Sequence, residues 1–265
     1  MKRFAIYCVT YNSYKELYQY LDSICTAVRE VKDTVTVDVF VADNTDKEYQ
    51  EITYHTDLIH LRIFAFHQNL GYFGAIRRMM EEVSPLSYDY TIISNVDMFL
   101  HADTLKDLCA YQCEENTGWI APAILSNIYK MDLNPQSVNR YTLKTLRLAW
   151  LTYRIPFIHD FYAKTFHKQR HKAQHPRGSI YAGHGSFFIL TKQYFQRCGP
   201  INYPIFLYDE ELYVAEECRL HGLKVMYEPS ISVSDIGKVS TGKTKRKLYR
   251  RWNAEGITYI IRKYY

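Results

Sequence analysis

Long apolar runs and closely paired cysteines are both missing from this chain of 265 residues. No stretch approaches the roughly 20 apolar residues that a membrane-spanning helix needs, and the apolar part of Lys2–Val9 ends too early for a signal peptide. The six cysteines include no Cys-x-x-Cys pair, so we interpret them as reduced structural thiols rather than zinc ligands. These absences predict a cytoplasmic protein.

Two glycine-rich nucleotide motifs are also absent. An NAD-dependent dehydrogenase would need Gly-x-Gly-x-x-Gly after its first strand, and no such segment follows Lys2–Val9. An enzyme that makes sugar nucleotides should carry a glycine-rich loop with a basic residue near residue 10, but Thr10–Ser13 has none. The net charge of +5 comes without a nucleic-acid-binding motif, so nucleic acid is not a predicted partner.

Hydrophobic residues make up 47% of the chain and aromatic residues 15%, which is enough to bury one large domain or one and a half. Short β-type runs alternate with helical ones in residues 1–100, as a parallel sheet with crossover helices requires. We expect a helix over Ser13–Val31 and strands over 119–124 and 183–190. These elements indicate an α/β fold.

The last two elements expected from the pattern lie in the C-terminal third. A helix is predicted from Glu211 to Leu220, and Gly222 closes it. A short strand over Lys224–Tyr227 should then end before Pro229.

Polar residues follow three of the predicted strands at their carboxyl ends. Tyr90–Ser94 leads into Asn95-Val96-Asp97, and Asp38–Ala42 leads into Asp43-Asn44-Thr45-Asp46. The first strand leads into Thr10-Tyr11-Asn12-Ser13. Ligands gather at this edge of open α/β sheets, and carboxylate oxygens suit the divalent cations that carry nucleotide phosphates. Taken singly, Asp97 could equally cap a helix or close a turn.

Five short motifs occur in an order that resembles a known family. They are Val9–Ser13, Val41–Asn44, Asn69–Gly71, Asn95–Asp97 and Phe206–Glu211. In this order and spacing the chain, from residue 4 to about residue 241, resembles family 2 glycosyltransferases of the GT-A fold, particularly the bacterial rhamnosyltransferase-like branch.

The resemblance implies an α/β, GT-A-like fold with a mainly parallel central sheet flanked by helices. It assigns residues 1–241 to a glycosyltransferase domain, with a nucleotide-binding half in 1–100 and an acceptor and catalytic half in 179–241. Residues 129–178 would form a variable insertion on the acceptor side, and residues 242–265 a basic aromatic C-terminal helix.

The resemblance also implies inverting transfer of a hexosyl or deoxyhexosyl group from a nucleoside-diphosphate sugar to a glycan or lipid-linked acceptor in cell-surface polysaccharide synthesis. Glu211 would be the catalytic base, with Glu210 as a possible substitute. Asp97 and Asp235 would bind a divalent metal, Mg²⁺ or Mn²⁺. The residues implied to bind the nucleotide sugar are Thr10, Tyr11, Asn12, Asp43, Asn44, Asn69, Gly71, Asn95 and Asp97.

Three of these positions depart from the family pattern. Asn95 stands where the metal-binding motif usually begins with Asp, Glu211 where the base is usually Asp, and Asp235 where His is usual. A non-catalytic subunit that binds nucleotide sugars in a degenerate GT-A site is therefore the alternative hypothesis.

Two basic segments leave their function open. Lys238–Tyr265 contains nine Lys or Arg and one acid among aromatic residues. One interpretation of that composition is peripheral association with the inner face of an anionic membrane. The other is a helix that packs on the domain and has a solvated basic face. The second segment contains His167, His171 and His175, which would share one face of a helix. That face could bind a metal ion, form a basic surface that faces the acceptor or the diphosphate, or simply be solvated.

Overall fold

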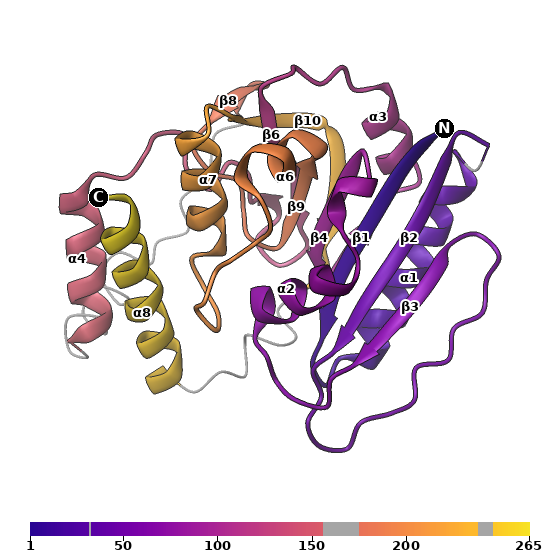
Figure 1. Ribbon diagram of the computed structural model, residues 1–265, viewed down its shortest axis with the longest axis horizontal. Coiled ribbons are helices and arrows are strands. Elements are labelled where there is room, and N and C mark those ends of the chain that lie inside the picture. The colour runs from indigo at the N-terminus through magenta and orange to yellow at the C-terminus, as the bar shows by residue number, and fades with distance from the viewer. Residues whose placement is uncertain (32, 156–174, 238–245) are drawn as a thin grey trace.

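The computed structural model describes residues 1–31, 33–155, 175–237 and 246–265. One mixed sheet runs through the described chain, with helices on both of its faces (Figure 1). Its strands are β1 (Lys2–Thr10), β2 (Val35–Asp43), β3 (His60–Ala65), β4 (Tyr90–Asn95), β5 (Met98–Leu100), β6 (Thr117–Ser126), β7 (Met131–Asp132), β8 (Gly178–Ile180), β9 (Phe187–Thr191) and β10 (Lys224–Asp235).

The helices alternate with the strands along the chain. They are α1 (Tyr14–Arg29), α2 (Tyr72–Glu82), the 3₁₀ turn η1 (Pro85–Ser87), α3 (Thr104–Ala110), α4 (Leu143–Arg154), α6 (Lys192–Cys198), α7 (Glu210–Leu220) and α8 (Arg246–Tyr264). None of the helices in the described ranges combines the length and the apolar composition that a bilayer crossing requires. All six cysteines are free of disulfide bonds.

The sheet has the strand order β3-β2-β1-β4-β9-β6-β10-β5, with β7 paired to β6 and β8 to β10. Strands β3, β2, β1 and β4 are parallel to one another, and β6 is parallel to β10. The expected mainly parallel sheet is found in these two parts. Between them β9 runs antiparallel to both β4 and β6, and β5 closes the far edge antiparallel to β10.

Two hydrophobic cores lie on opposite faces of the sheet because successive side chains of a strand point to opposite sides. In β1, Phe4 and Ile6 pack in the core that contains α1, whereas Ala5 and Tyr7 pack in the core that contains α2. All four are fully buried. Burial on both faces explains why the strand reads as one nearly continuous apolar run.

Several predicted boundaries need adjustment. The helix expected over Ser13–Val31 is α1, and its predicted apolar face is buried. The strand expected over 183–190 begins only at Phe187, because residues 183–186 form a loop beside the site. The strand expected over Lys224–Tyr227 continues to Asp235, because a register shift between Glu228 and Ser232 takes Pro229 out of the ladder.

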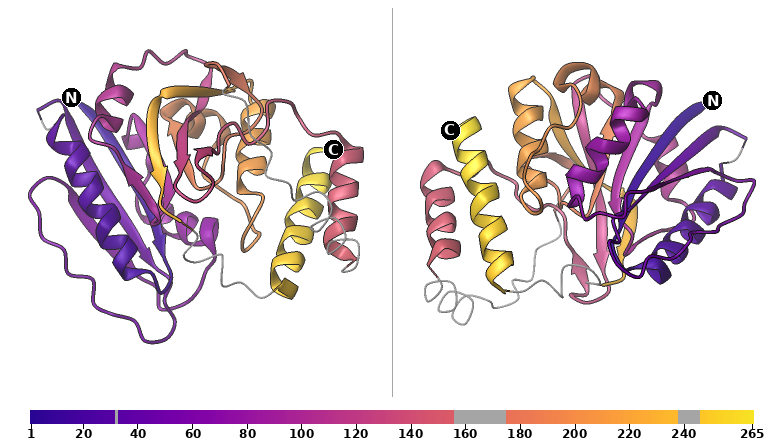
Figure 2. Two further views of the ribbon diagram at one scale, coloured as in Figure 1. Left: turned by 180° about the vertical axis from the view of Figure 1, so that it is seen from behind. Right: turned by 60° about the horizontal axis from the view of Figure 1, so that its bottom comes forward.

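Helices α4 and α8 form a pair beside α7, at one end of the molecule (Figure 2). Trp150 of α4 donates its indole N–H to Thr258 of α8 at 3.0 Å. Lys263 of α8 forms an ion pair of 2.7 Å with Glu217 of α7. The C-terminal helix therefore packs on the domain, in agreement with one of the two interpretations of the basic tail.

Candidate functional site

A cleft of about 550 Å³ opens between the ends of β4 and β10 and the start of α7. It brings together Asn95, Asp97, Glu210, Glu211 and Asp235, five of the residues proposed from the sequence. They come from positions up to 140 residues apart, joined by the central strands β4 and β10 of one sheet.

The acidic turn at the start of α7 contributes three adjacent carboxyl side chains to the cleft, those of Asp209, Glu210 and Glu211. Tyr208 and Asp209 both have positive φ, 79° and 64°, which turns the chain sharply into the helix. Glu210 is only 5% exposed, and its carboxylate accepts the Tyr208 N–H at 3.1 Å. Glu211 lies against Gly185: a Cβ placed on that glycine would lie 2.9 Å from the Glu211 Oε2. The two adjacent acids thus have separate environments.

Burial dominates the ionisation of these three carboxyls. It raises the pKa of Glu210 to about 8, with the Glu211 charge adding to the shift and the N–H groups of Glu210 and Tyr208 opposing it. Burial also raises the pKa of Glu211, and a hydrogen bond from its own backbone N–H partly opposes this shift. Burial raises the pKa of Asp209 as well, and the charges of Glu211 and Glu210 add to that shift. A raised pKa makes the deprotonated carboxylate a stronger proton acceptor, as a general base requires, provided that this form is populated at neutral pH.

Asp97 and Asp235 lie close together because β5 pairs with β10. Met98 is opposite Asp235 in the register, and the Asp97 carbonyl accepts the Ile236 N–H at 3.0 Å. The Asp235 carboxylate accepts the Gly237 N–H at 3.0 Å. The departure from His to Asp at position 235 therefore keeps an oxygen ligand next to Asp97.

The residues at this point fit a divalent cation in part. Two carboxylates and the amide of Asn95 offer oxygen atoms, which Mg²⁺ and Mn²⁺ prefer. Within the described residues no group of three His, Cys, Asp or Glu side chains gathers to complete a protein cage. This donor set suits a cation whose remaining ligands are diphosphate oxygens and water.

Three of the proposed nucleotide residues, Thr10, Asp43 and Asn44, lie at the ends of β1 and β2, beside the cleft rather than in its lining. Asp43 is 1% exposed, and its carboxylate accepts the Thr45 N–H at 3.0 Å and the Tyr14 hydroxyl at 2.9 Å. Asn44 donates its backbone N–H to the Thr10 carbonyl at 2.9 Å. Asp43, expected to contact the base or ribose, thus also holds the two strand ends together.

The other predicted nucleotide residues form the adjoining loops. Asn12, at φ 53°, donates its backbone N–H to the Thr45 hydroxyl, and the Tyr11 hydroxyl lies 3.4 Å from Asp46. Both residues keep solvent exposure, as a base-contacting loop requires.

Gly71 connects the nucleotide loops to the acidic turn. Its φ of 75° and its contact with the Phe206 carbonyl leave no room for a Cβ. Asn69 accepts the Gly71 N–H at 3.1 Å, and Asn44 donates its side-chain amide to the Gly71 carbonyl at 2.9 Å. The loop that ends at Gly71 therefore contacts the segment that leads to Glu210 and Glu211.

Helix α8 forms a wall of the cleft that the sequence analysis did not predict. Tyr249 and Asn253 line the cleft, and Trp252 stacks on Phe206 with ring centroids 4.6 Å apart. A Cβ on Gly256 would overlap the Asp209 carboxylate. The spacing 249, 252, 253 and 256 marks one helix face and could have indicated this wall.

Two histidine predictions have different outcomes. His167 and His171 lie outside the described residues, and the ring of His175 contacts the carbonyl of Pro176. His184, which was assigned only to a strand, instead lines the cleft, with its Nδ1 2.9 Å from the Ser186 hydroxyl. Its position between Gly183 and Gly185 was the available signal.

Comparisons with known proteins identify the family and the fold. The sequence profile of glycosyl transferase family 2 matches residues 6–191. No curated protein sequence matches the chain closely enough to be a relative. The crystal structure of GalNAc-T7 with UDP, GalNAc and Mn²⁺ is similar at a TM-score of 0.63 and 11% identity, over 99% of this chain and 48% of that one.

Crystal structures of S. aureus TarS are similar as well. The structure of residues 1–349 gives a TM-score of 0.53 at 12% identity, covering 89% of this chain and 60% of that one. A second TarS structure gives a TM-score of 0.54 at 15% identity and covers 91% of this chain and 37% of that one. The chain spans about half to three fifths of the first two structures. At these identities the likeness identifies the GT-A fold.

Proposed function

The chain belongs to glycosyl transferase family 2, and on this premise we propose that it transfers a sugar, with inversion, from a nucleoside-diphosphate sugar to an acceptor hydroxyl. The acceptor would be a glycan or a lipid-linked sugar in cell-surface polysaccharide synthesis. One observation carries the proposal: Glu211 and the buried acid Glu210 share a cleft with Asp97 and Asp235.

Donor binding would use both halves of the sheet edge. The loops of Thr10 and Asp43 would hold the base and ribose, and Asn69 with Gly71 would border the same pocket. Asp97 and Asp235 would hold a divalent cation, which supplies charge neutralisation for the departing diphosphate. The Mn²⁺ and UDP bound to the similar GalNAc-T7 structure support a cation and a nucleotide of this kind.

Glu211 is the proposed base. Its carboxylate would take the proton of the acceptor hydroxyl while that oxygen forms a bond to the anomeric carbon. The bond from the anomeric carbon to the diphosphate oxygen breaks on the opposite face, and the diphosphate leaves with the electron pair. Glu210 is less suited to this role at neutral pH, because its pKa of about 8 keeps it mostly protonated.

The alternative is a subunit that binds the nucleotide sugar without turning it over, which the departures at Asn95, Glu211 and Asp235 favour. A thermal-shift screen of UDP-, GDP- and dTDP-sugars with and without Mn²⁺ identifies the preferred donor, since a ligand that binds only the folded state stabilises it. Release of nucleoside diphosphate from that donor then distinguishes the two functions. A catalyst releases it, whereas stabilisation without release would refute enzymatic transfer.

We also propose that the protein works in the cytoplasm at the inner face of an anionic membrane, where a lipid-linked acceptor would lie. The basic side chains of Arg246 and Lys247 on α8 are exposed and support this position. Co-sedimentation with liposomes should rise with anionic lipid content and fall with salt. Sedimentation that is indifferent to both would remove the membrane from the proposal.

A further inference from the structure

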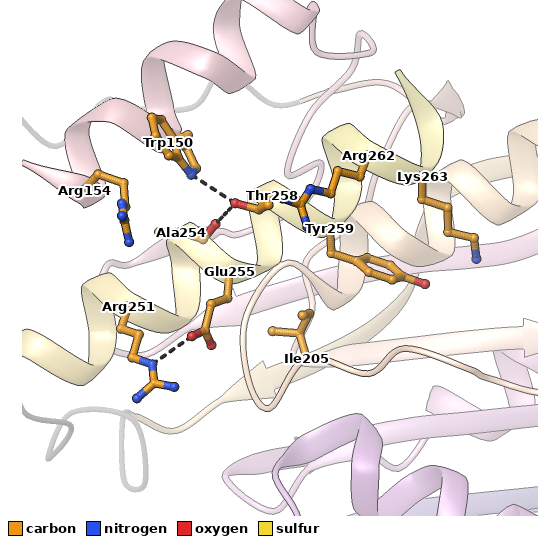
Figure 3. Close-up of a pocket in the computed structure, with 10 residues that line it drawn as sticks. All are labelled: Trp150, Arg154, Ile205, Arg251, Ala254, Glu255, Thr258, Tyr259, Arg262 and Lys263. Carbon is orange, nitrogen blue, oxygen red and sulfur yellow. Dashed lines mark hydrogen bonds and ion pairs between the residues drawn. The ribbon is translucent and has the colours of Figure 1, made fainter.

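A second concavity, of about 700 Å³, lies between α4, α8 and the loop that contains Ile205 (Figure 3). We call it the α4–α8 groove. None of its lining residues lines the catalytic cleft. The groove needs its own explanation, because neither donor binding nor the proposed proton transfer uses it.

Positive charge dominates the α4–α8 groove. Arg154 of α4 and Arg251, Arg262 and Lys263 of α8 line it, against the single acid Glu255. Glu255 is engaged by Arg251 at 2.8 Å, as Figure 3 shows. Lys263 is engaged outside the groove by its ion pair with α7.

Within the described residues, the remaining two cations, Arg154 and Arg262, have no neutralising acid. Among the described residues no carboxylate lies within ion-pair distance of Arg154 or Arg262, although Arg154 lies over the Trp150 ring at 5.7 Å from its centroid. Guanidinium groups bind phosphate oxygens through paired N–H donors, which makes an anionic phosphate the complementary ligand.

Apolar surface makes up most of the remaining wall, to which Thr258 adds one hydroxyl. Trp150, Ile205, Ala254 and the ring of Tyr259 face the same space as the arginines (Figure 3). A fully polar anion would leave this surface without a partner. The combination fits a ligand that carries a phosphate at the end of a hydrocarbon chain.

The groove and the cleft share helix α8 as a wall. Tyr249 and Asn253 face the cleft, and Arg251, Ala254 and Thr258 face the groove. A helix with its side chains is roughly 10 Å across. The groove and the cleft therefore lie on two sides of the same helix.

We propose that the α4–α8 groove binds the phosphate end of a lipid-linked acceptor, with the positive charge of Arg154 and Arg262 attracting the phosphate and Trp150 and Ile205 against the first part of the chain. This inference rests on the proposed function for the identity of the ligand. It adds the acceptor class and the residues that recognise it.

The test measures binding of farnesyl diphosphate to the full chain without any donor sugar, by the change in tryptophan fluorescence. Inorganic pyrophosphate and farnesol serve as the charge-only and chain-only probes. The variants are Arg154→Gln and Arg262→Gln. Lys144→Gln is the matched control, because Lys144 is an exposed cation of α4 that does not line the groove.

Farnesyl diphosphate should bind at least tenfold more tightly than either partial probe. Each arginine variant should weaken this binding about tenfold, the loss expected for one charge-assisted contact, and the lysine control should leave it unchanged. Equal weakening in the control would overturn the proposal, as would pyrophosphate binding as tightly as farnesyl diphosphate. Loss of binding to anionic vesicles in the arginine variants, with no effect on farnesyl diphosphate, would assign the groove to the membrane surface instead.

Failure of this inference is separable from failure of the proposed function. Both arginine variants should keep the wild-type thermal shift with the preferred nucleotide sugar, because neither residue lies near the donor site. An unchanged donor response with no binding of farnesyl diphosphate would refute the groove alone.

Discussion

Replacing Glu211 by Gln tests the proposed base most directly. The amide keeps the size of the side chain and fits the space beside Gly185, but it cannot take up a proton. General-base catalysis contributes about 10²–10⁴-fold, which corresponds to about 3–5 kcal/mol of activation free energy. We therefore expect the transfer rate to fall by that factor while donor affinity stays within about twofold of the wild type.

The pH dependence supplies a second readout with a defined sign. The base acts only when deprotonated, and burial raises the pKa of Glu211 above that of an ordinary glutamate. Wild-type kcat/KM should accordingly fall as pH drops through this raised pKa. In Glu211→Gln this acid limb should disappear from the residual activity.

Glu210→Gln is the matched control. With a pKa of about 8, Glu210 is already mostly protonated at pH 7 and resembles the amide. Its substitution should change transfer little at pH 7. Both profiles are obtained by measuring the release of nucleoside diphosphate with donor and acceptor between about pH 5.5 and 9. This range extends more than about one unit on either side of neutrality, as the shifted pKa values require. A loss confined to Glu210→Gln would move the base by one residue, and full activity in both variants would refute base catalysis from this turn.

Four further changes test other parts of the site. Asp97→Ala should abolish the Mn²⁺-dependent part of donor binding in a thermal-shift titration without unfolding the protein, and an unchanged Mn²⁺ response would refute its assignment. Asp43→Ala should weaken nucleotide binding even without metal and cost about 1–3 kcal/mol of stability in urea unfolding, because two donors lose their acceptor; a loss restricted to the metal-dependent part would show that Asp43 is misassigned. Asp235→His should keep measurable transfer and Asp235→Ala should lose more, whereas equal rates for the Ala variant and wild type would exclude this position from the site. Gly256→Ala should lower transfer more than donor binding by displacing Asp209, and wild-type transfer would show that the wall tolerates a side chain.

Local patterns were sufficient to predict β1, α1, β2 and β4, whereas β3 and β5 were not predicted. The apolar runs that end at Thr10, Asp43 and Asn95 became parallel strands with those residues at one edge. The helix between the first two strands was also predicted, because its buried stripe has helical spacing. These strands and this helix depend on residues that are neighbours along the chain, so they can be predicted from the local sequence pattern.

Features that depend on distant contacts could not be predicted in the same way. Nothing local shows that β9 inserts antiparallel between β4 and β6, since its apolar run would suit either direction. The role of α8 as a cleft wall depends on Gly256 meeting Asp209, a contact between segments 47 residues apart. The motifs identified Glu210 and Glu211 as candidates, but the tertiary packing determines which neighbours shift their pKa values.

The contact between α8 and the acidic turn affects the order in which the site matures during synthesis. The ribosome makes α8 after every strand of the sheet, so the sheet can form while the turn at Asp209 is still open to water. Before α8 docks, the carboxyls would keep ordinary acidity and would repel one another as charged groups. The close approach of Gly256 to Asp209 in the folded chain excludes water, and burial raises the pKa of Asp209, so docking would be accompanied by proton uptake. On the proposed mechanism, the cleft is then complete only after this helix has docked.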